Sequence, residues 1–244
     1  MQITKYVKSE CVVFCKTKEK YGALSSMSSG YPLRVNGYDI NTSEALYQAC
    51  KFPHSPELQH KIINAKSPFA AEIIGKQYRE QVRQDWSKVA VDIMLWSLQV
   101  KLAEHWNNFG GILESTGNMP IVKYSRTDEF WGAKQSNEDE NILEGYNVFG
   151  KLLMILRSKY LSLKEPVIFG EGYYVEPLEI DSFHLLGEPI ETIYSFTRNI
   201  RRSEMLNRTA FVKDEDGSLS RFVVKPRYLQ PRDYPANSIH RKRK

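Results

Sequence analysis

Cysteine is scarce in this sequence, and the few cysteines present form no recognisable pattern. The 244 residues contain Cys11, Cys15 and Cys50, and the five histidines are not spaced with them as zinc ligands would be. An odd number of thiols argues against a disulfide framework, and the absent ligand spacing argues against a zinc site. The sequence therefore predicts a cytoplasmic protein that needs neither a metal ion nor another cofactor.

Long apolar segments are also missing. No run of about 18 apolar residues occurs, and residues 1–16 lack the apolar stretch of a signal peptide. The sequence contains no nucleophile elbow, no Walker-type phosphate loop and no zinc motif. We therefore expect a soluble protein that does not contact a membrane and does not use those three routes to catalysis.

The composition itself is ordinary for a globular protein, but the charge is unevenly distributed. Hydrophobic residues make up 41% and charged residues 26% of the chain. Residues 195–244 contain 13 Lys and Arg against 5 Asp and Glu, a net of +8, whereas residues 1–194 contain 21 against 24, a net of −3. Concentrated positive charge attracts polyanions such as nucleic acid. A solubilising tail explains this charge equally well.

Short strands are predicted near the start of the chain and again after its middle. Residues 11–15 are an apolar run of strand length, and residues 31–38 alternate around the pair Asn36-Gly37, which is typical of a hairpin. A further strand and a polar loop are predicted at residues 121–125 and 134–144.

Capping residues and proline delimit the first predicted helices. Residues 41–44 have the pattern of a capping box, and Pro53 ends the helix that they open. Serine–proline pairs at 55–56 and 67–68 predict two more helix starts, the second helix ending at Gly75.

Two longer helices complete this part of the chain. One is predicted to begin at Asp85 or Ser87, to run to about residue 107 and to be closed by the glycine pair 110–111. The other is a strongly apolar helix over residues 146–160. The expected fold class is α+β, predominantly helical with a small antiparallel sheet.

The character of the sequence changes after Leu163. Residues 164–190 are rich in proline and glycine, and residues 190–206 have the pattern of a helix. Its surface would carry the basic side chains Arg198, Arg201 and Arg202, candidates for contacts with nucleic acid. A catalytic domain is therefore predicted at 1–163 and an extension at 164–244, basic from about 195.

That extension contains one further element. Residues 210–212 and 221–224 flank the turn-prone segment 214–217, which predicts a β-hairpin. The remaining residues, which end in a basic run, are predicted to be disordered.

Three polar side chains fall in a row on the first predicted helix. If Glu44 is placed at 0° on a helix of about 100° per residue, Gln48 falls near 40° and Lys51 near −20°. A carboxylate, an amide and an amine on one strip suit a catalytic site. Glu44 as a capping-box carboxylate and Lys51 as a solvated lysine are the alternatives. Mutual ion pairing does not explain the two charges, because their spacing exceeds three or four residues.

Other candidates follow along the chain. Asp128 precedes Trp131 and Gly132, which offers an acid/base group beside a stacking surface, although a core position is the more common role of tryptophan. Arg83 could meet a phosphate or could belong to a helix start. Asn147 could contact a ligand or could cap the helix that follows it.

Taken together, these segments resemble the NADAR family, also described as YbiA-like, over residues 14–157. The matching pieces are Leu24-Ser25-Ser26-Met27, Thr42-Ser43-Glu44 with Gln48 and Lys51, Ala65 with Ser67-Pro68, Gly75, Arg83-x-Asp85-Trp86, Met94, Lys101, Thr116-Gly117, Asp128-x-x-Trp131-Gly132, and Gly145-x-Asn147-x-x-Gly150 with Met154 and Arg157.

The chain departs from the family pattern at a few positions. Ser26-Met27 stands where the family usually has Asn-Phe, and residues 45–47 replace its usual His-Tyr-Phe. Phe149 stands where a leucine is usual. The first two departures lie at or beside the expected pocket, so the substrate could differ from that of the better-known members.

The resemblance implies hydrolysis of the N-glycosidic bond of a ribosyl phosphate compound. It makes Lys51 the covalent or electrostatic centre and gives Glu44 and Asp128 acid/base and sugar-positioning duties. Gln48, Trp131, Gly132, Asn147 and Arg83 would hold the ligand.

Three functions remain open under this resemblance. The basic extension favours removal of ADP-ribose from guanine in DNA, as in antitoxins of the DarT–DarG type that counteract a partner ADP-ribosyltransferase toxin. A glycosidase acting on small phosphoribosylated intermediates of riboflavin synthesis is the second. A non-catalytic module that binds ADP-ribose or nucleic acid is the third.

Overall fold

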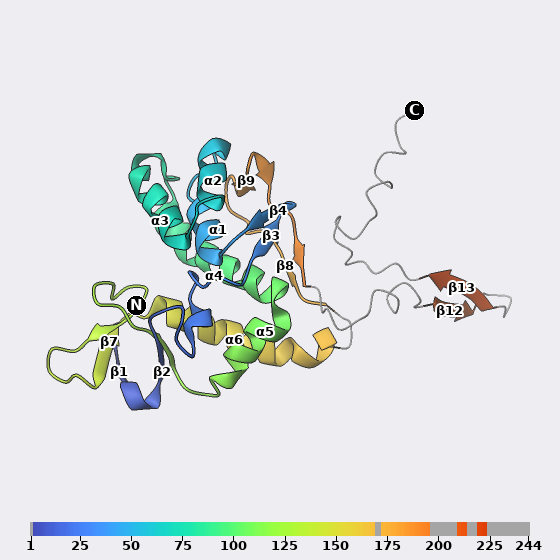
Figure 1. The fold of residues 1–244 in the computed structure, drawn as a ribbon. Coiled ribbons are helices and arrows are strands. Elements are labelled where there is room, and N and C mark those ends of the chain that lie inside the picture. The colour runs from blue at the N-terminus through green and yellow to red at the C-terminus, as the bar shows by residue number, and fades with distance from the viewer. Residues whose placement is uncertain (1, 169–171, 196–208, 214–218, 224–244) are drawn as a thin grey trace. The chain divides into compact units, whose positions relative to one another are not determined.

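The computed structural model describes residues 2–168, 172–195, 209–213 and 219–223. Residues 1–195 form one compact unit and residues 196–244 a second. The fold is α+β, as predicted, and helices dominate the first unit (Figure 1). The α-helices of the described residues are α1 (Ser43–Ala49), α2 (Pro56–Ile63), α3 (Pro68–Gln77), α4 (Trp86–Glu104), α5 (Trp106–Ser115) and α6 (Val148–Ile168).

The strands are short and pair mostly in an antiparallel manner. A three-stranded sheet has the order β1-β7-β6, and β2 pairs with β5 in parallel. The other pairs are β3–β4, β8–β11, β9–β10 and β12–β13, all antiparallel. The strands are β1 (Thr4–Val7), β2 (Val12–Phe14), β3 (Leu33–Val35), β4 (Tyr38–Ile40), β5 (Ile121–Lys123), β6 (Lys134–Gln135), β7 (Ile142–Gly145), β8 (Tyr174–Val175), β9 (His184–Leu185), β10 (Glu188–Pro189), β11 (Ile193–Tyr194), β12 (Thr209–Lys213) and β13 (Leu219–Val223).

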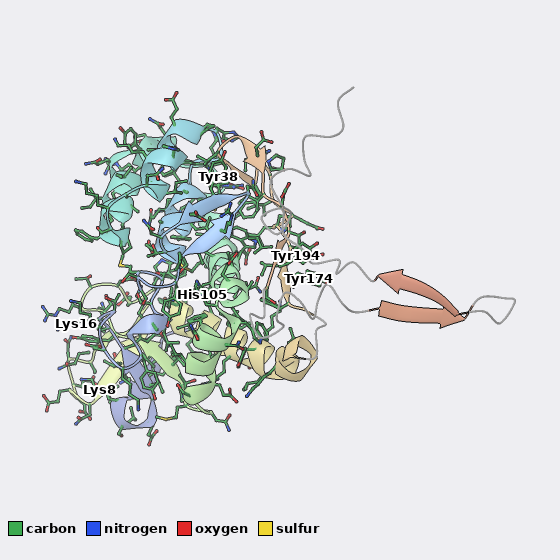
Figure 2. The ribbon with its side chains drawn as sticks, turned by 45° about the vertical axis from the view of Figure 1, so that its right-hand side comes forward. Lys8, Lys16, Tyr38, His105, Tyr174 and Tyr194 are labelled. Atoms are coloured by element: carbon green, nitrogen blue, oxygen red, sulfur yellow. The ribbon has the colours of Figure 1, made fainter. Side chains whose placement is uncertain are left out.

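The predicted hairpin around Asn36 and Gly37 is confirmed. Both residues have positive φ, 50° and 83°, which is the requirement of a two-residue turn whose twist matches the flanking strands. The Asn36 side chain donates a hydrogen bond to the Pro189 carbonyl at 2.9 Å and accepts one from the Glu191 N–H at 3.0 Å. Figure 2 labels Tyr38 on this hairpin. The turn therefore also anchors a distant segment of the chain.

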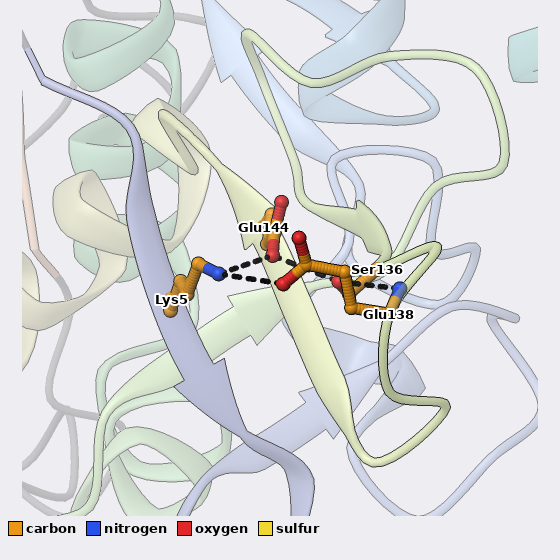
Figure 3. Close-up of polar contacts among 4 residues, drawn as sticks. All are labelled: Lys5, Ser136, Glu138 and Glu144. Atoms are coloured by element: carbon orange, nitrogen blue, oxygen red, sulfur yellow. Dashed lines mark hydrogen bonds and ion pairs between the residues drawn. The ribbon is translucent and has the colours of Figure 1, made fainter.

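Residues 134–144, predicted as a loop, contain two strands. The ends of this segment, β6 and β7, pair with each other, and β7 also pairs with β1. The Lys5 amine of β1 lies 3.2 Å from the Glu144 carboxylate and 3.4 Å from that of Glu138, and the Ser136 hydroxyl donates to Glu144 (Figure 3). Because Lys5 and Glu138 are exposed, such pairs contribute little stability each.

The glycines that were predicted to end helices lie inside helices. Gly75 lies inside α3, which continues to Gln77. Gly110 and Gly111 lie inside α5 and do not close α4, which ends at Glu104. A Cβ at Gly110 would overlap the Tyr160 ring of α6. Glycine at this position therefore allows α5 and α6 to pack closely, and it does not end a helix.

The first compact unit extends to Ser195, beyond the boundary expected at 163. Helix α6 continues to Ile168, and residues 172–195 pack on α4. The Trp96 indole N–H donates to the Glu176 carbonyl at 3.0 Å, and its ring meets that of Phe183 at 4.8 Å. Figure 2 labels Tyr174 and Tyr194 on the paired strands β8 and β11.

The helix predicted over 190–206 is wrong for its first residues. Residues 193–194 form β11, because an extended conformation allows them to pair with β8. The remainder of that predicted helix, with Arg198, Arg201 and Arg202, lies outside the described residues, as does the predicted disordered end. In the second unit the predicted hairpin is confirmed as β12 and β13, which pair from Thr209 with Val223 to Lys213 with Leu219.

None of the helices in the described part of the chain combines the length and the apolar character that crossing a membrane would require.

The two neighbouring glycines of α5 allow a matched test of its packing. Gly110→Ala should lower the free energy of unfolding by about 1–3 kcal/mol, because the added methyl group overlaps the buried Tyr160 ring. Gly111→Ala should instead be neutral or stabilise by up to about 1 kcal/mol, since its Cβ enters open space and alanine favours the helix. Urea denaturation of both variants measures the difference. Equal effects would show that the α5–α6 contact does not depend on Gly110.

Candidate functional site

Helix α1 lies entirely within the protein. Its first turn is capped by Thr42, whose hydroxyl accepts a hydrogen bond from the Ala45 N–H at 3.2 Å. All of its residues, from Ser43 to Ala49, are buried. The helix ends there, ahead of the expected end at Pro53, and Lys51 follows in the turn after it.

Glu44 is a buried carboxylate with defined partners. Its side chain is only 6% exposed, Oε2 accepts a hydrogen bond from the Ser26 hydroxyl at 2.7 Å, and Oε1 accepts one from the Gln48 amide at 2.7 Å. The backbone N–H of Glu44 donates to the Ser26 carbonyl at 3.0 Å. The capping-box alternative is therefore wrong, because the carboxylate bonds two side chains and not the start of its own helix.

Gln48 presents an unused acceptor. It is 3% exposed, and its Oε1 has no hydrogen-bond partner among the described residues. A Cβ at Gly75 of α3 would overlap this oxygen, so glycine at that position leaves the space that Oε1 occupies. A buried carbonyl oxygen without a donor costs about 1–3 kcal/mol, which a hydroxyl or N–H of a bound ligand could recover.

Lys51 lies against aromatic rings at the end of the strip. Its Nζ is 5.2 Å from the centre of the Trp86 ring and 5.5 Å from that of Tyr47. Burial lowers the pKa of Lys51, while the nearby carboxylates of Glu44 and Glu72 act in the opposite direction. Lys51 is therefore not an ordinary solvated lysine, and a lowered pKa increases the fraction of free, nucleophilic amine.

Tyr47 connects the two ends of the site. Its ring lies 5.0 Å from that of Trp86 and meets Trp131 edge to face at 6.0 Å. Burial raises the pKa of Tyr47, and the charges of Glu44 and Asp128 add to that shift. Trp131 and the Lys51 amine thus both contact the Tyr47 ring, and the carboxylates of Glu44 and Asp128 lie close enough to act on its hydroxyl.

Asp128 shapes the loop that carries Trp131. Its Oδ1 accepts hydrogen bonds from the backbone N–H groups of Phe130 at 3.0 Å and of Trp131 at 2.9 Å. Asp128 and Trp131 are both partly exposed, so a ligand has access to the carboxylate and to the indole. One carboxylate oxygen is thus committed to the turn.

Asn147 and Gly132 both contact the backbone of β5. The Asn147 side chain is fully buried, and it accepts from the Lys123 N–H at 3.1 Å and donates to the Ile121 carbonyl at 2.9 Å. A Cβ at Gly132 would overlap the Lys123 carbonyl. Both residues join the Trp131 loop and the start of α6 to β5, which favours a supporting role over direct contact with a ligand.

Arg83 is likewise engaged within the protein. Its side chain is 4% exposed, and it binds both oxygens of Asp85 at 2.6 and 2.9 Å and the Asp181 carbonyl at 2.6 Å. A hollow of about 610 Å³ beside it is also lined by His54, Glu80, Asp85 and Asp181. These bonds connect the start of α4 to residues 172–195, while Arg83 Nη1 is buried without a hydrogen-bond partner among the described residues.

Several residues of this cluster have no sequence signal that marks them as functional. Ser26 was noticed only as a departure from the family pattern, yet its hydroxyl contacts Glu44. Glu72 of α3, which pairs with Lys76 at 2.6 Å, acts through its charge to raise the pKa of Lys51. Within the described residues no group of three or more histidine, cysteine or acidic side chains is placed to hold a metal ion.

The chain is similar to known proteins over more than half of its length. The chain is 29% identical to N-glycosidase YbiA from Escherichia coli over 146 residues, which are 60% of this chain and 86% of that protein. It is 33% identical over 166 residues to the riboflavin biosynthesis protein PYRR, chloroplastic, from Zea mays, of which it spans only a quarter. The NMR structure of Escherichia coli YbiA superposes with a TM-score of 0.53 at 26% identity, covering 64% of this chain and 89% of that one. The NADAR domain model matches residues 13–161, and the chain therefore belongs to the NADAR domain family.

Proposed function

We propose that the protein is an N-glycosidase that hydrolyses the bond between C1′ of a ribosyl phosphate compound and a nitrogen of its base. The observation that carries this proposal is the grouping of a buried carboxylate, Glu44, with a half-buried amine, Lys51, around the Tyr47 ring. The names of the related N-glycosidases from Escherichia coli and Nostoc punctiforme support it.

The chemistry requires stabilisation of positive charge and a proton for the base. Cleavage of a C1′–N bond develops positive charge at C1′ and at the ring oxygen, and a nearby carboxylate stabilises it. Both oxygens of Glu44 are fixed by hydrogen bonds, which suits this electrostatic role. Asp128, which is more accessible, would transfer the proton to the leaving base.

Lys51 offers a covalent route. The ribose would first open by breakage of the C1′–O4′ bond, with O4′ taking up a proton and C1′ becoming double-bonded to the nitrogen of the base. The Lys51 amine would add to C1′, and the C1′–N bond to the base would then break, so that the base leaves with a proton from the amine and a Schiff base remains. Water would then add to the resulting Schiff base and release the sugar and the free amine. The lowered pKa of Lys51 supports this role, because the nucleophile must be unprotonated.

The preferred substrate is guanine in DNA that carries ADP-ribose. Residues 195–244 have a net charge of +8 while the remainder has −3, and only a polynucleotide offers many phosphates outside the pocket. Such an activity would counteract a partner ADP-ribosyltransferase toxin. The names of the relatives from Zea mays and Vibrio vulnificus favour a second candidate, a small phosphoribosylated intermediate of riboflavin synthesis.

Lys51→Ala should abolish turnover without unfolding the protein. Because the amine packs on the rings of Tyr47 and Trp86, its loss should change the melting temperature by only a few degrees. Lys61→Ala is the matched control, since Lys61 also lies over a tyrosine ring, that of Tyr78, but on the exposed side of α2. Release of the free base is measured for both variants.

Borohydride reduction tests the covalent route directly. Reductant added during turnover should leave a sugar adduct on the wild type, visible by intact mass, and none on Lys51→Ala. A folded Lys51→Ala protein with a near-normal rate would remove the lysine from the mechanism. Normal turnover without an adduct would leave Lys51 an electrostatic role only.

Asp128→Asn and Asp128→Ala separate the two duties of Asp128. Asparagine retains an oxygen for the Phe130 and Trp131 N–H groups but cannot exchange the proton, so its kcat should fall by about a hundredfold or more. Alanine also removes the turn and should additionally raise KM through the displaced Trp131. If Asp128→Asn retains the wild-type kcat, the residue only shapes the loop.

Salt dependence distinguishes the two substrates. If residues 195–244 bind DNA phosphates, KM for modified DNA must rise steeply with salt, because each neutralised phosphate releases counterions. A free ADP-ribosylated guanosine should respond far less. Replacing Arg198, Arg201 and Arg202 together should raise KM for DNA, flatten its salt dependence and leave the nucleoside unaffected. Equal salt responses for both substrates would favour the riboflavin-type glycosidase.

A further inference from the structure

A lysine lies at the centre of the hydrophobic core, on helix α4. Lys101 is 0% exposed, and its Nζ donates hydrogen bonds to the backbone carbonyls of Ala23 at 2.6 Å and of Ser25 at 3.0 Å. The same atom is 4.4 Å from the ring centres of Tyr31 and Phe109. Carbonyl oxygens and aromatic faces thus surround the ammonium group.

This position is costly for a lysine. Removing an ammonium group from water is unfavourable, and burial lowers the pKa of Lys101 to about 7. An apolar side chain of similar size would fill the same volume without that cost. What the lysine holds in place therefore explains its presence better than core packing does.

The two carbonyls belong to the segment that leads into the site. Residues Gly22–Leu24 form the 3₁₀ turn η2, which is followed by Ser25 and Ser26. Ser26 contacts α1 at three points: its hydroxyl donates to the Glu44 carboxylate, and its carbonyl accepts from the Glu44 N–H and, at 3.2 Å, from the Ser43 hydroxyl. Lys101 therefore binds the carbonyl group of Ser25, the residue that directly precedes Ser26.

We propose that Lys101 is a positioning residue: by holding the Ala23 and Ser25 carbonyls, it fixes Ser26 and thereby orients the Glu44 carboxylate in the active site. The catalytic consequence rests on the N-glycosidase activity proposed above, whereas the mechanical consequence does not. A neutral amine retains two N–H donors for the two carbonyls, so the grip depends on the hydrogen bonds more than on the charge.

Lys101→Met tests the proposal, because it keeps the length and volume of the side chain and removes its donors. Leu156→Ala, at a fully buried position of α6, is the control for general loss of core stability. The first measurement is hydrogen exchange of the Glu44 amide, made without substrate. Exchange should become at least tenfold faster in Lys101→Met than in Leu156→Ala when the two are compared at denaturant concentrations that equalise their stability.

The second measurement is kinetic and uses the full chain. Lys101→Met should lower kcat by about tenfold to a hundredfold with little change in KM, because a misplaced Glu44 harms the transition state more than substrate binding. In a Ser26→Ala background the same substitution should lower kcat much less, because the hydrogen bond from the Ser26 hydroxyl to Glu44 is already absent. If Lys101→Met does not fold, Lys101→Gln, which keeps an N–H donor at shorter reach, replaces it with the same expectation.

The outcomes separate the two proposals. Unchanged Glu44 exchange, or additive effects of Lys101→Met and Ser26→Ala on kcat, would overturn the positioning role. A wild-type protein without activity on either substrate, combined with accelerated Glu44 exchange in Lys101→Met, would instead refute the N-glycosidase proposal and leave the positioning role intact.

Discussion

The burial of the Glu44 carboxylate is the constraint on which the rest of the site depends. A carboxylate inside a protein is stable only where hydrogen bonds replace its hydration. Ser26, in the segment before β3, and Gln48, one turn further along α1, supply those two bonds. Both side chains must therefore keep a defined position relative to Glu44. Gly75 follows from the same requirement, because Gln48 needs the space that a side chain on α3 would fill.

A second set of contacts keeps the Trp131 loop beside this carboxylate. Gly132, Gly145 and Gly150 each let one stretch of backbone approach another, and Asn147 bonds to the backbone of β5. These residues therefore hold the Trp131 loop, β5 and the start of α6 together. The close backbone contacts of these glycines hold the Trp131 loop where the Trp131 ring meets that of Tyr47. The glycines therefore support the site without contacting a ligand.

The site was predictable where residues close in sequence share a helix, and unpredictable where they meet across elements. Helical spacing alone placed Glu44 and Gln48 together, and their hydrogen bond confirms it. The same spacing did not predict that both are buried, because periodicity describes one helix and not the elements that cover it. The resemblance to a known family joined Asp128 and Trp131 to this strip, which no local pattern could do.

The local sequence therefore determined which helices and turns form. Tertiary contacts determined where the helices end and why particular residues occupy them. Asn36 and Gly37 specify their turn through backbone conformation, and the serine–proline pairs specify helix starts, because these preferences act within a few residues. Gly75 and Gly110 had the local signature of helix ends, yet both lie inside helices. Only the neighbouring Gln48 and Tyr160 decide this, since the reason for each glycine is a contact with a distant part of the chain.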